Sequence, residues 1–169
     1  MKALTLWPEW VWAVLHLGKR VENRGFQFPA SLIRKTVALH AGKHVGGRPG
    51  AVAYREGLEC LVIMATRADW KVSGWTNTGV PVVEFSKDGV VVRTDTTPIV
   101  TSAVVGTFCM DYRVQHGDCG HPGWKVPDAF WWPILNLEAL PVPVDCKGAQ
   151  GFWDLPEDVL ARLKIERKS

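Results

Sequence analysis

Short runs of alternating polar and apolar residues recur along the chain, and this period of two is typical of β-strands. The runs that predict strands are 2–7, 20–28, 36–43 and the longer 99–114. Two further runs, 80–85 and 90–94, flank the sequence Ser-Lys-Asp-Gly. Asp-Gly between two strand-like runs is a strong hairpin signal, so we expect these two strands to pair.

Three segments carry a helical pattern instead. Residues 8–17 place apolar side chains on one face, with Pro8 at the first helical position and Gly18 just past the last one. Residues 49–64 also show helical spacing. Near the end of the chain, Asp154 stands three residues before Glu157, which predicts a capping box at the start of a short helix.

These elements define the expected fold class. Many short strands, few helices and many turn residues predict an α+β protein, a small mixed β-barrel with flanking helices. A chain of 169 residues with 47% apolar content fits one globular domain over residues 1–169.

Composition indicates the cellular location that we expect for the protein. No apolar run approaches membrane-spanning length, and the N-terminal residues do not resemble a secretory signal, so no membrane partner is expected. The four cysteines are far apart and form no disulfide framework, which favours a reducing, cytoplasmic location. Nothing in the chain indicates a cofactor or fixes the oligomeric state.

Charge is distributed unevenly. Residues 1–48 contain eight Lys and Arg residues but two carboxylates, whereas the remainder contains twelve and fifteen. A basic first third suits a polyanionic partner such as single-stranded nucleic acid. An ordinary solvated basic surface explains the same counts equally well.

The segment from Gly18 to Gly25 is unusually rich in hydrogen-bonding groups. If it runs from a helix end into a strand, Glu22 and Arg24 share one strand face. Glu22 could then accept from a base amino group, and Arg24 could bind a phosphate, with Lys19 adding a charge. Alternatively, the three side chains form a buried network that only orients the strand.

Three tryptophans surround the start of the first helix. Trp7, Trp10 and Trp12 point in different directions, so they cannot all be core residues. An exposed ring near the basic segment would offer a stacking surface for a base. Trp10 lies on the apolar face and fits the core better, whereas Trp7 fits either position.

A glycine-rich loop holds a weak set of metal-ligand candidates. His116, Cys119 and His121 are close in sequence, and Cys109 could be a fourth ligand. Their spacings match no standard zinc motif, so we predict no metal.

The order of motifs resembles the ASCH domain family of the PUA-like barrel superfamily. The segment 19–24 is similar to the family's Lys-x-hydrophobic-Glu-x-Arg element, and 40–43 to its strand ending His-Ala. The segment 141–153 is similar to a Pro-Val-Pro…Gly-x-x-Gly-hydrophobic-Trp element. Residues from about 49 to 97 match no family motif and are expected to be an elaboration. Where the family usually has Gln-Pro-Trp, this chain has Pro8-Glu9-Trp10.

The resemblance implies a PUA-like barrel that binds RNA or a modified nucleobase in a basic, aromatic-lined cleft. It suggests a bacterial or phage protein that takes single-stranded nucleic acid, a nucleoside or a nucleotide. The expected ligand-binding residues are Trp7, Trp10, Asn23, Arg24, His40 and Lys43.

An enzymatic alternative stays open. Some members of the family hydrolyse N4-acetylcytidine with a threonine three residues after a lysine, and another has ribonuclease activity. This chain keeps the lysine as Lys19 but has Glu22 at the threonine position. As a hydrolase, it would use Lys19 and Glu22 as catalytic residues, with Glu22 activating water and His40 as the acid. Asp111 is a guess for a third member.

Overall fold

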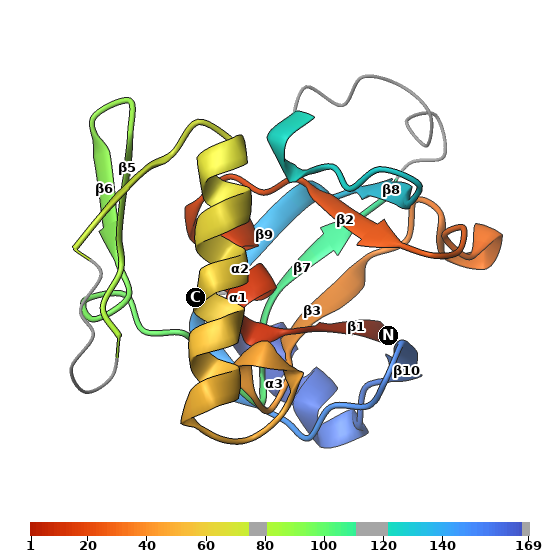
Figure 1. Ribbon diagram of the computed structural model, residues 1–169. Coiled ribbons are helices and arrows are strands. Elements are labelled where there is room, and N and C mark those ends of the chain that lie inside the picture. The colour runs from red at the N-terminus through yellow and green to blue at the C-terminus, as the bar shows by residue number, and fades with distance from the viewer. Residues whose placement is uncertain (75–80, 111–121, 167–169) are drawn as a thin grey trace.

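Figure 1 shows a computed structural model of the protein, which describes residues 1–74, 81–110 and 122–166. The fold is mixed α+β, as the pattern predicts. Its longer helices are α1 (Pro8–His16), α2 (Ala51–Arg67) and α3 (Glu157–Glu166). Within the described ranges, short 3₁₀ turns are η1 (Ala30–Leu32), η2 (Val45–Gly47) and η4 (Pro122–Trp124).

The largest sheet has five strands in the order β10-β1-β3-β7-β9. Its strands are β1 (Lys2–Leu6), β3 (Val37–Ala41), β7 (Ala103–Cys109), β9 (Leu135–Asp145) and β10 (Phe152–Asp154). β1 and β3 run parallel, whereas the other neighbours are antiparallel. The carboxyl ends of β1 and β3 therefore lie next to each other at the same end of the sheet.

Two smaller sheets complete the strands. β2 (Val21–Arg24) pairs with β8 (Phe130–Pro133), and β4 (Lys71–Ser73), β5 (Glu84–Lys87) and β6 (Val90–Arg93) form a three-stranded sheet. In Figure 1 the long helix α2 stands between the β5–β6 hairpin and the five-stranded sheet.

Three apolar clusters join these parts. One lies on the large sheet and includes Leu39 and Trp132. A second joins α1 to α2 and to β5 through Trp12, Leu58 and Phe85. The third packs α3 onto the sheet. The region around 49–97, expected to be an elaboration, thus shares a core with α1.

Most of the predicted elements are confirmed, with shifted ends. The hairpin turn has positive φ at both Asp88 (51°) and Gly89 (80°), the conformation that favours Asp-Gly in two-residue turns. The strand predicted over 20–28 ends at Arg24, and the helix predicted over 49–64 extends to Arg67.

The capping box is wrong. Asp154 ends strand β10, and its carboxylate accepts from Lys2 Nζ at 2.8 Å rather than capping a helix. The helix begins at Glu157, after Pro156. The pattern could not reveal this, because the partner of Asp154 lies at the other end of the chain.

Closure into a barrel stays a prediction. Among the described residues, the strand ladders form three separate sheets, with β10 and β9 at the edges of the largest. No helix in the described part of the chain is long and apolar enough to cross a membrane.

Candidate functional site

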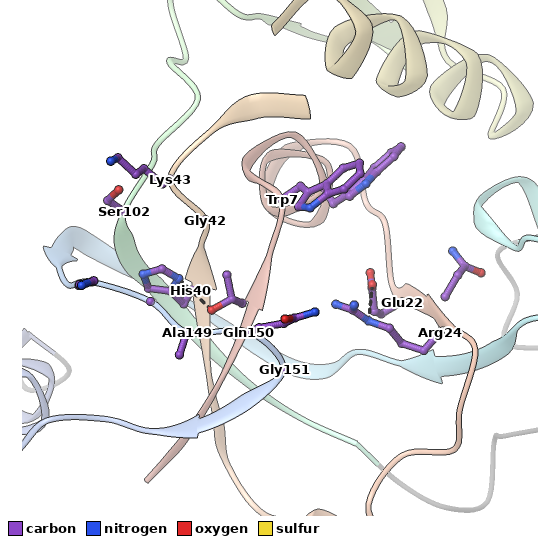
Figure 2. Close-up of a pocket in the computed structure, with 15 residues that line it drawn as sticks. Trp7, Glu22, Arg24, His40, Gly42, Lys43, Ser102, Ala149, Gln150 and Gly151 are labelled. Atoms are coloured by element: carbon purple, nitrogen blue, oxygen red, sulfur yellow. Dashed lines mark hydrogen bonds and ion pairs between the residues drawn. The ribbon is translucent and has the colours of Figure 1, made fainter. Parts of the chain in front are cut away.

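A pocket of about 610 Å³ opens at the carboxyl ends of β1 and β3. Figure 2 shows that β2 forms one side of this pocket and that the loop 147–151 passes along the other. Fifteen residues line it: Thr5, Trp7, Trp10, Glu22, Asn23, Arg24, His40, Gly42, Lys43, Ser102, Lys147, Gly148, Ala149, Gln150 and Gly151. All six residues predicted to bind a ligand are among them.

The β2 side is built from the turn that ends α1. Gly18 has φ +67°, a left-handed conformation that glycine adopts without strain, and it redirects the chain into β2. The amide of Lys19 donates to the carbonyl of Ala13, closing the helix end. The next side chains, Lys19 and Glu22, consequently meet each other beside the pocket.

Glu22 is held between two cations. Lys19 Nζ lies 2.9 Å from Glu22 Oε2, and Arg24 Nε lies 3.0 Å from Glu22 Oε1. Lys19 Nζ also donates to the carbonyl of Val21. A buried network of the kind expected from the sequence is therefore present at Lys19 and Glu22, although Glu22 also reaches the pocket wall.

Lys19 differs from its expected place. Its side chain is 2% exposed and does not line the main pocket. It borders a smaller cavity of about 150 Å³ instead, together with Trp10 and Met64. A ligand in the main pocket would meet Glu22 and Arg24, with Lys19 behind them.

This arrangement limits the chemistry open to Glu22. A general base needs a carboxylate oxygen within hydrogen-bonding reach of the proton it removes. Both oxygens of Glu22 already face cations, at 2.9 and 3.0 Å. The geometry suits a residue that positions Arg24 better than one that activates water.

Arg24 keeps part of its guanidinium group available. Its side chain is 30% exposed, and its Nε atom is the one that faces Glu22. In Figure 2 the end of the Arg24 side chain points across the pocket toward Gln150. The two terminal nitrogens of Arg24 can therefore donate to a ligand that lies between Arg24 and Gln150.

Trp7 and Trp10 have different environments. Trp7 is 53% exposed, and Gly47 supports its ring so closely that a Cβ there would lie 2.8 Å from it. Trp10 is half-buried and packs against two of the apolar clusters. Trp7 is thus the exposed aromatic surface of the pocket, and Trp10 is partly a core residue, as its helical position predicts.

The support for Trp7 depends on a buried carboxylate. Glu9 is fully buried, and its Oε1 accepts from the amide of Gly46 at 3.1 Å, which holds the turn that carries Gly47. No described residue hydrogen-bonds its Oε2. Burial raises the pKa of Glu9 above its usual value.

Asn23 lines the pocket, but the protein uses its amide. Nδ2 donates to the carbonyl of Trp124, and Oδ1 accepts from the amide of Val126, each at 2.9 Å. Asn23 therefore holds the 124–126 segment beside β2. Its predicted role in direct ligand binding does not fit these contacts.

His40 sits in a chain of hydrogen bonds. Trp153 Nε1 donates to Thr5 Oγ1 at 3.0 Å, Thr5 Oγ1 lies 3.2 Å from His40 Nδ1, and His40 Nε2 lies 2.9 Å from the carbonyl of Cys146. A carbonyl only accepts, so this network assigns the proton to Nε2 and leaves Nδ1 to accept from the Thr5 hydroxyl.

Both nitrogens of His40 are thus engaged, and the residue is 1% exposed. Burial lowers the pKa of His40 below its usual value, which favours the neutral ring. The sequence-based idea that His40 donates a proton to a leaving amine does not fit this environment. Its ring instead fixes the chain where the loop 147–151 begins.

Sequence reasoning missed that loop. The loop packs directly on His40, because a Cβ at Gly148 would lie 2.3 Å from His40 Cε1. The signal was present, since Gly148 and Gly151 belong to the motif matched at 141–153. The motif indicated the family resemblance but not that this loop returns to the pocket.

Three of the weak metal-ligand candidates lie outside the described residues. His116, Cys119 and His121, as well as Asp111, lie outside the described residues. Cys109 accepts from Asn136 Nδ2 at 3.3 Å. Within the described ranges, no group of three or more His, Cys, Asp and Glu side chains could hold a metal ion.

Comparison with known proteins adds no assignment. Neither the models of known protein families nor the curated proteins give a significant match to this chain.

Proposed function

We propose that this protein is a PUA-like module that binds a nucleobase, within single-stranded nucleic acid or as a nucleotide, in the pocket of about 610 Å³. One observation carries the proposal. An exposed tryptophan, Trp7, and a partly exposed arginine, Arg24, line the same pocket. Stacking and hydrogen bonding to a base edge are the two contacts by which proteins bind unpaired bases.

The dimensions of the pocket fit this ligand. Its volume falls within the range of about 300–1,000 Å³ found for small-molecule sites. Gly47 supports one part of the Trp7 ring, and the exposed remainder can stack on a base. Stacking tolerates any base, so Trp7 would contribute affinity more than selectivity.

Selectivity would come from the polar groups. Arg24 offers donors only, whereas the Gln150 side chain offers both donors and an acceptor. Figure 2 shows them approaching from opposite sides. A base between them would present acceptors to Arg24 and either kind of group to Gln150.

Binding without turnover is the expected behaviour. Glu22, the candidate base, faces Lys19 and Arg24, and His40 bonds to protein groups through both nitrogens. Incubation with N4-acylated cytidines and with short RNAs should therefore yield no product. Turnover that is lost in Glu22→Gln would instead support the hydrolase.

The test of the proposal is a binding measurement with a matched control. We expect short single-stranded RNA or DNA, or nucleotides, to raise the melting temperature, because a ligand stabilises the fold it binds. Trp7→Ala should weaken binding by about 1–3 kcal/mol, the usual contribution of one stacked base. Phe26→Ala is the control, since Phe26 is also 53% exposed but does not line the pocket.

Two results would contradict the proposal. One is the absence of binding by any of these ligands at low salt, where contacts to phosphate are strongest. The other is binding that Trp7→Ala and Phe26→Ala weaken to the same extent, since the pocket would then not be the site.

A further inference from the structure

The pocket has a second polar region, away from Arg24. Lys43, Ser102 and Lys147 line this part of the pocket wall, and the carboxylate of Glu22 lies on the β2 side. In Figure 2 Lys43 and Ser102 lie together beyond His40, on the side opposite to Glu22 and Arg24. Sequence reasoning had singled out Lys43 alone.

The backbone holds these three residues together. The amide of Ser102 donates to the carbonyl of Gly42 at 3.0 Å, and the amide of Cys146 donates to the carbonyl of Ser102 at 2.9 Å. Lys43 directly follows Gly42, and Lys147 directly follows Cys146. Ser102 is therefore the bridge that brings the two lysines to one rim, although they are far apart in sequence.

The positive charges of Lys43 and Lys147 are not neutralised by a carboxylate of the described residues, unlike the charge of Arg24. Neither Lys43 nor Lys147 forms an ion pair with a carboxylate among the described residues, whereas Arg24 faces Glu22. The hydroxyl of Ser102 forms no hydrogen bond within the described part of the chain. Two positive charges and a free hydroxyl donor thus border one end of the pocket.

The adjoining loop adds further donors. Within the described residues, the backbone amides of Gly148, Ala149 and Gln150 donate to no backbone acceptor. Successive backbone N–H groups can contribute donors to an anion bound beside them. Gly148 also lets the backbone approach closely, since even a Cβ would collide with His40.

We propose that Lys43, Ser102 and Lys147 form a phosphate subsite, so that the ligand is a nucleotide and not a free base or nucleoside. This inference rests on the proposed function, because it takes the base to lie against Trp7. The phosphate would be a terminal phosphate of a mononucleotide or the backbone phosphate next to the bound base in a single strand.

The test compares ligands with and without phosphate. The four ribonucleosides and their 5′-monophosphates would each be titrated into the full chain at low salt and followed by calorimetry. We expect the monophosphate of the preferred base to bind at least about tenfold more tightly than its nucleoside, because hydrogen bonds to charged groups are strong.

A double variant and a matched control locate the effect. Lys43→Gln with Lys147→Gln should reduce the affinity for the monophosphate about tenfold and leave nucleoside binding unchanged. Lys35→Gln with Lys71→Gln removes the same charge from exposed positions outside the pocket, and we expect it to change neither. Melting temperatures of both variants verify that they fold.

The outcomes separate the two proposals. Equal affinities for nucleoside and monophosphate, both reduced by Trp7→Ala, would overturn the phosphate subsite and leave the proposed function standing. Equal losses in the two lysine double variants would overturn it too, since net charge alone would explain them. If no nucleoside, nucleotide or oligonucleotide binds in a Trp7-dependent way, both proposals fail.

Discussion

The two sides of the pocket differ in the burial and pairing of their charged side chains. On the β2 side, the buried carboxylate of Glu22 is already paired, both with buried Lys19 and with partly exposed Arg24. On the other side, Lys43, Lys147 and Gln150 are exposed on the rim. Buried ion pairs contribute to fold and orientation, and removing one partner is costly. Exposed groups contribute little to stability, so they are free to serve a ligand.

The largest expected effect tests the buried side. Glu22→Ala leaves Lys19 buried at 2% exposure without its carboxylate, so we expect a loss of about 3–5 kcal/mol in the free energy of unfolding. Urea denaturation followed by tryptophan fluorescence measures it. Lys2→Ala is the control, because it breaks an exposed pair and should cost about 0–1 kcal/mol.

The combination Lys19→Met with Glu22→Leu sharpens this prediction. If burial of an unpaired charge causes the loss, removing both charges should restore much of the stability that Glu22→Ala removes. A double variant as unstable as Glu22→Ala would show that packing, and not charge, is responsible.

The next largest effect concerns the contact between the loop 147–151 and His40. Gly148→Ala would place a Cβ 2.3 Å from His40 Cε1, and the hydrogen bonds at both nitrogens prevent that ring from moving away. We expect a cost of about 1–3 kcal/mol, as for other overpacked sites. Ala149→Ser, at an exposed neighbouring position, should cost nothing measurable. Equal stability of the two variants would mean that the loop shifts freely.

A smaller effect should appear as a dependence of stability on pH. Because burial lowers the pKa of His40, the folded protein binds a proton less readily than the unfolded chain. The contribution of neutral His40 to the free energy of unfolding is thus complete above about pH 6.5, the unperturbed pKa of histidine. It is lost as the pH falls below that value. Glu9 acts oppositely, since its raised pKa lowers stability as the pH rises above about 4.5.

Comparison with a variant isolates the histidine. We expect the difference in unfolding free energy between the parent and His40→Gln to shrink as the pH is lowered from 7.5 to 5. Denaturation curves at several pH values measure this difference. A difference that stays constant over that range would show that His40 does not titrate as its environment requires.

The smallest effect on stability comes from the exposed side. Gln150→Ala should change the unfolding free energy by less than about 0.5 kcal/mol, as is usual for surface positions. The same substitution should alter which base binds most tightly, because Gln150 reaches into the pocket. Unchanged base preference would remove Gln150 from the recognition proposed above.

The elements of the fold were predictable because their signals are local. Pro8 begins α1 and Gly18 follows its end. The two-residue hairpin turn needs positive φ at both central positions, and Asp88 and Gly89 are residue types that adopt it. The same locality made Asp154 misleading, since it pairs with Lys2 across the chain. The length of the strand predicted over 20–28 was also wrong, because the pairing with β8 extends only over residues 21–24.

The site was predictable on its N-terminal side for a similar reason. Once the chain passes from the end of α1 into β2, the spacing of Lys19, Glu22 and Arg24 brings them close together. What the spacing could not show is which of them faces inward, because the burial of Lys19 depends on residues distant in sequence, such as Met64, which borders the same small cavity. Gln150 was missed because its place in the pocket depends on the pairing of β10 with β1.

That pairing also affects how the pocket forms during folding. β10 bonds to β1, so residues 152–154 reach their places only by closing a loop that spans almost the entire chain. Closing so long a loop is costly in entropy, and contacts of this kind form slowly. The β1–β3 end of the pocket is formed by residues 2–43, whereas the loop 147–151 on the opposite side is synthesised much later. Ligand binding during synthesis must therefore wait until the β10 segment has been made and has paired with β1, and a bound ligand would stabilise this long-range pairing.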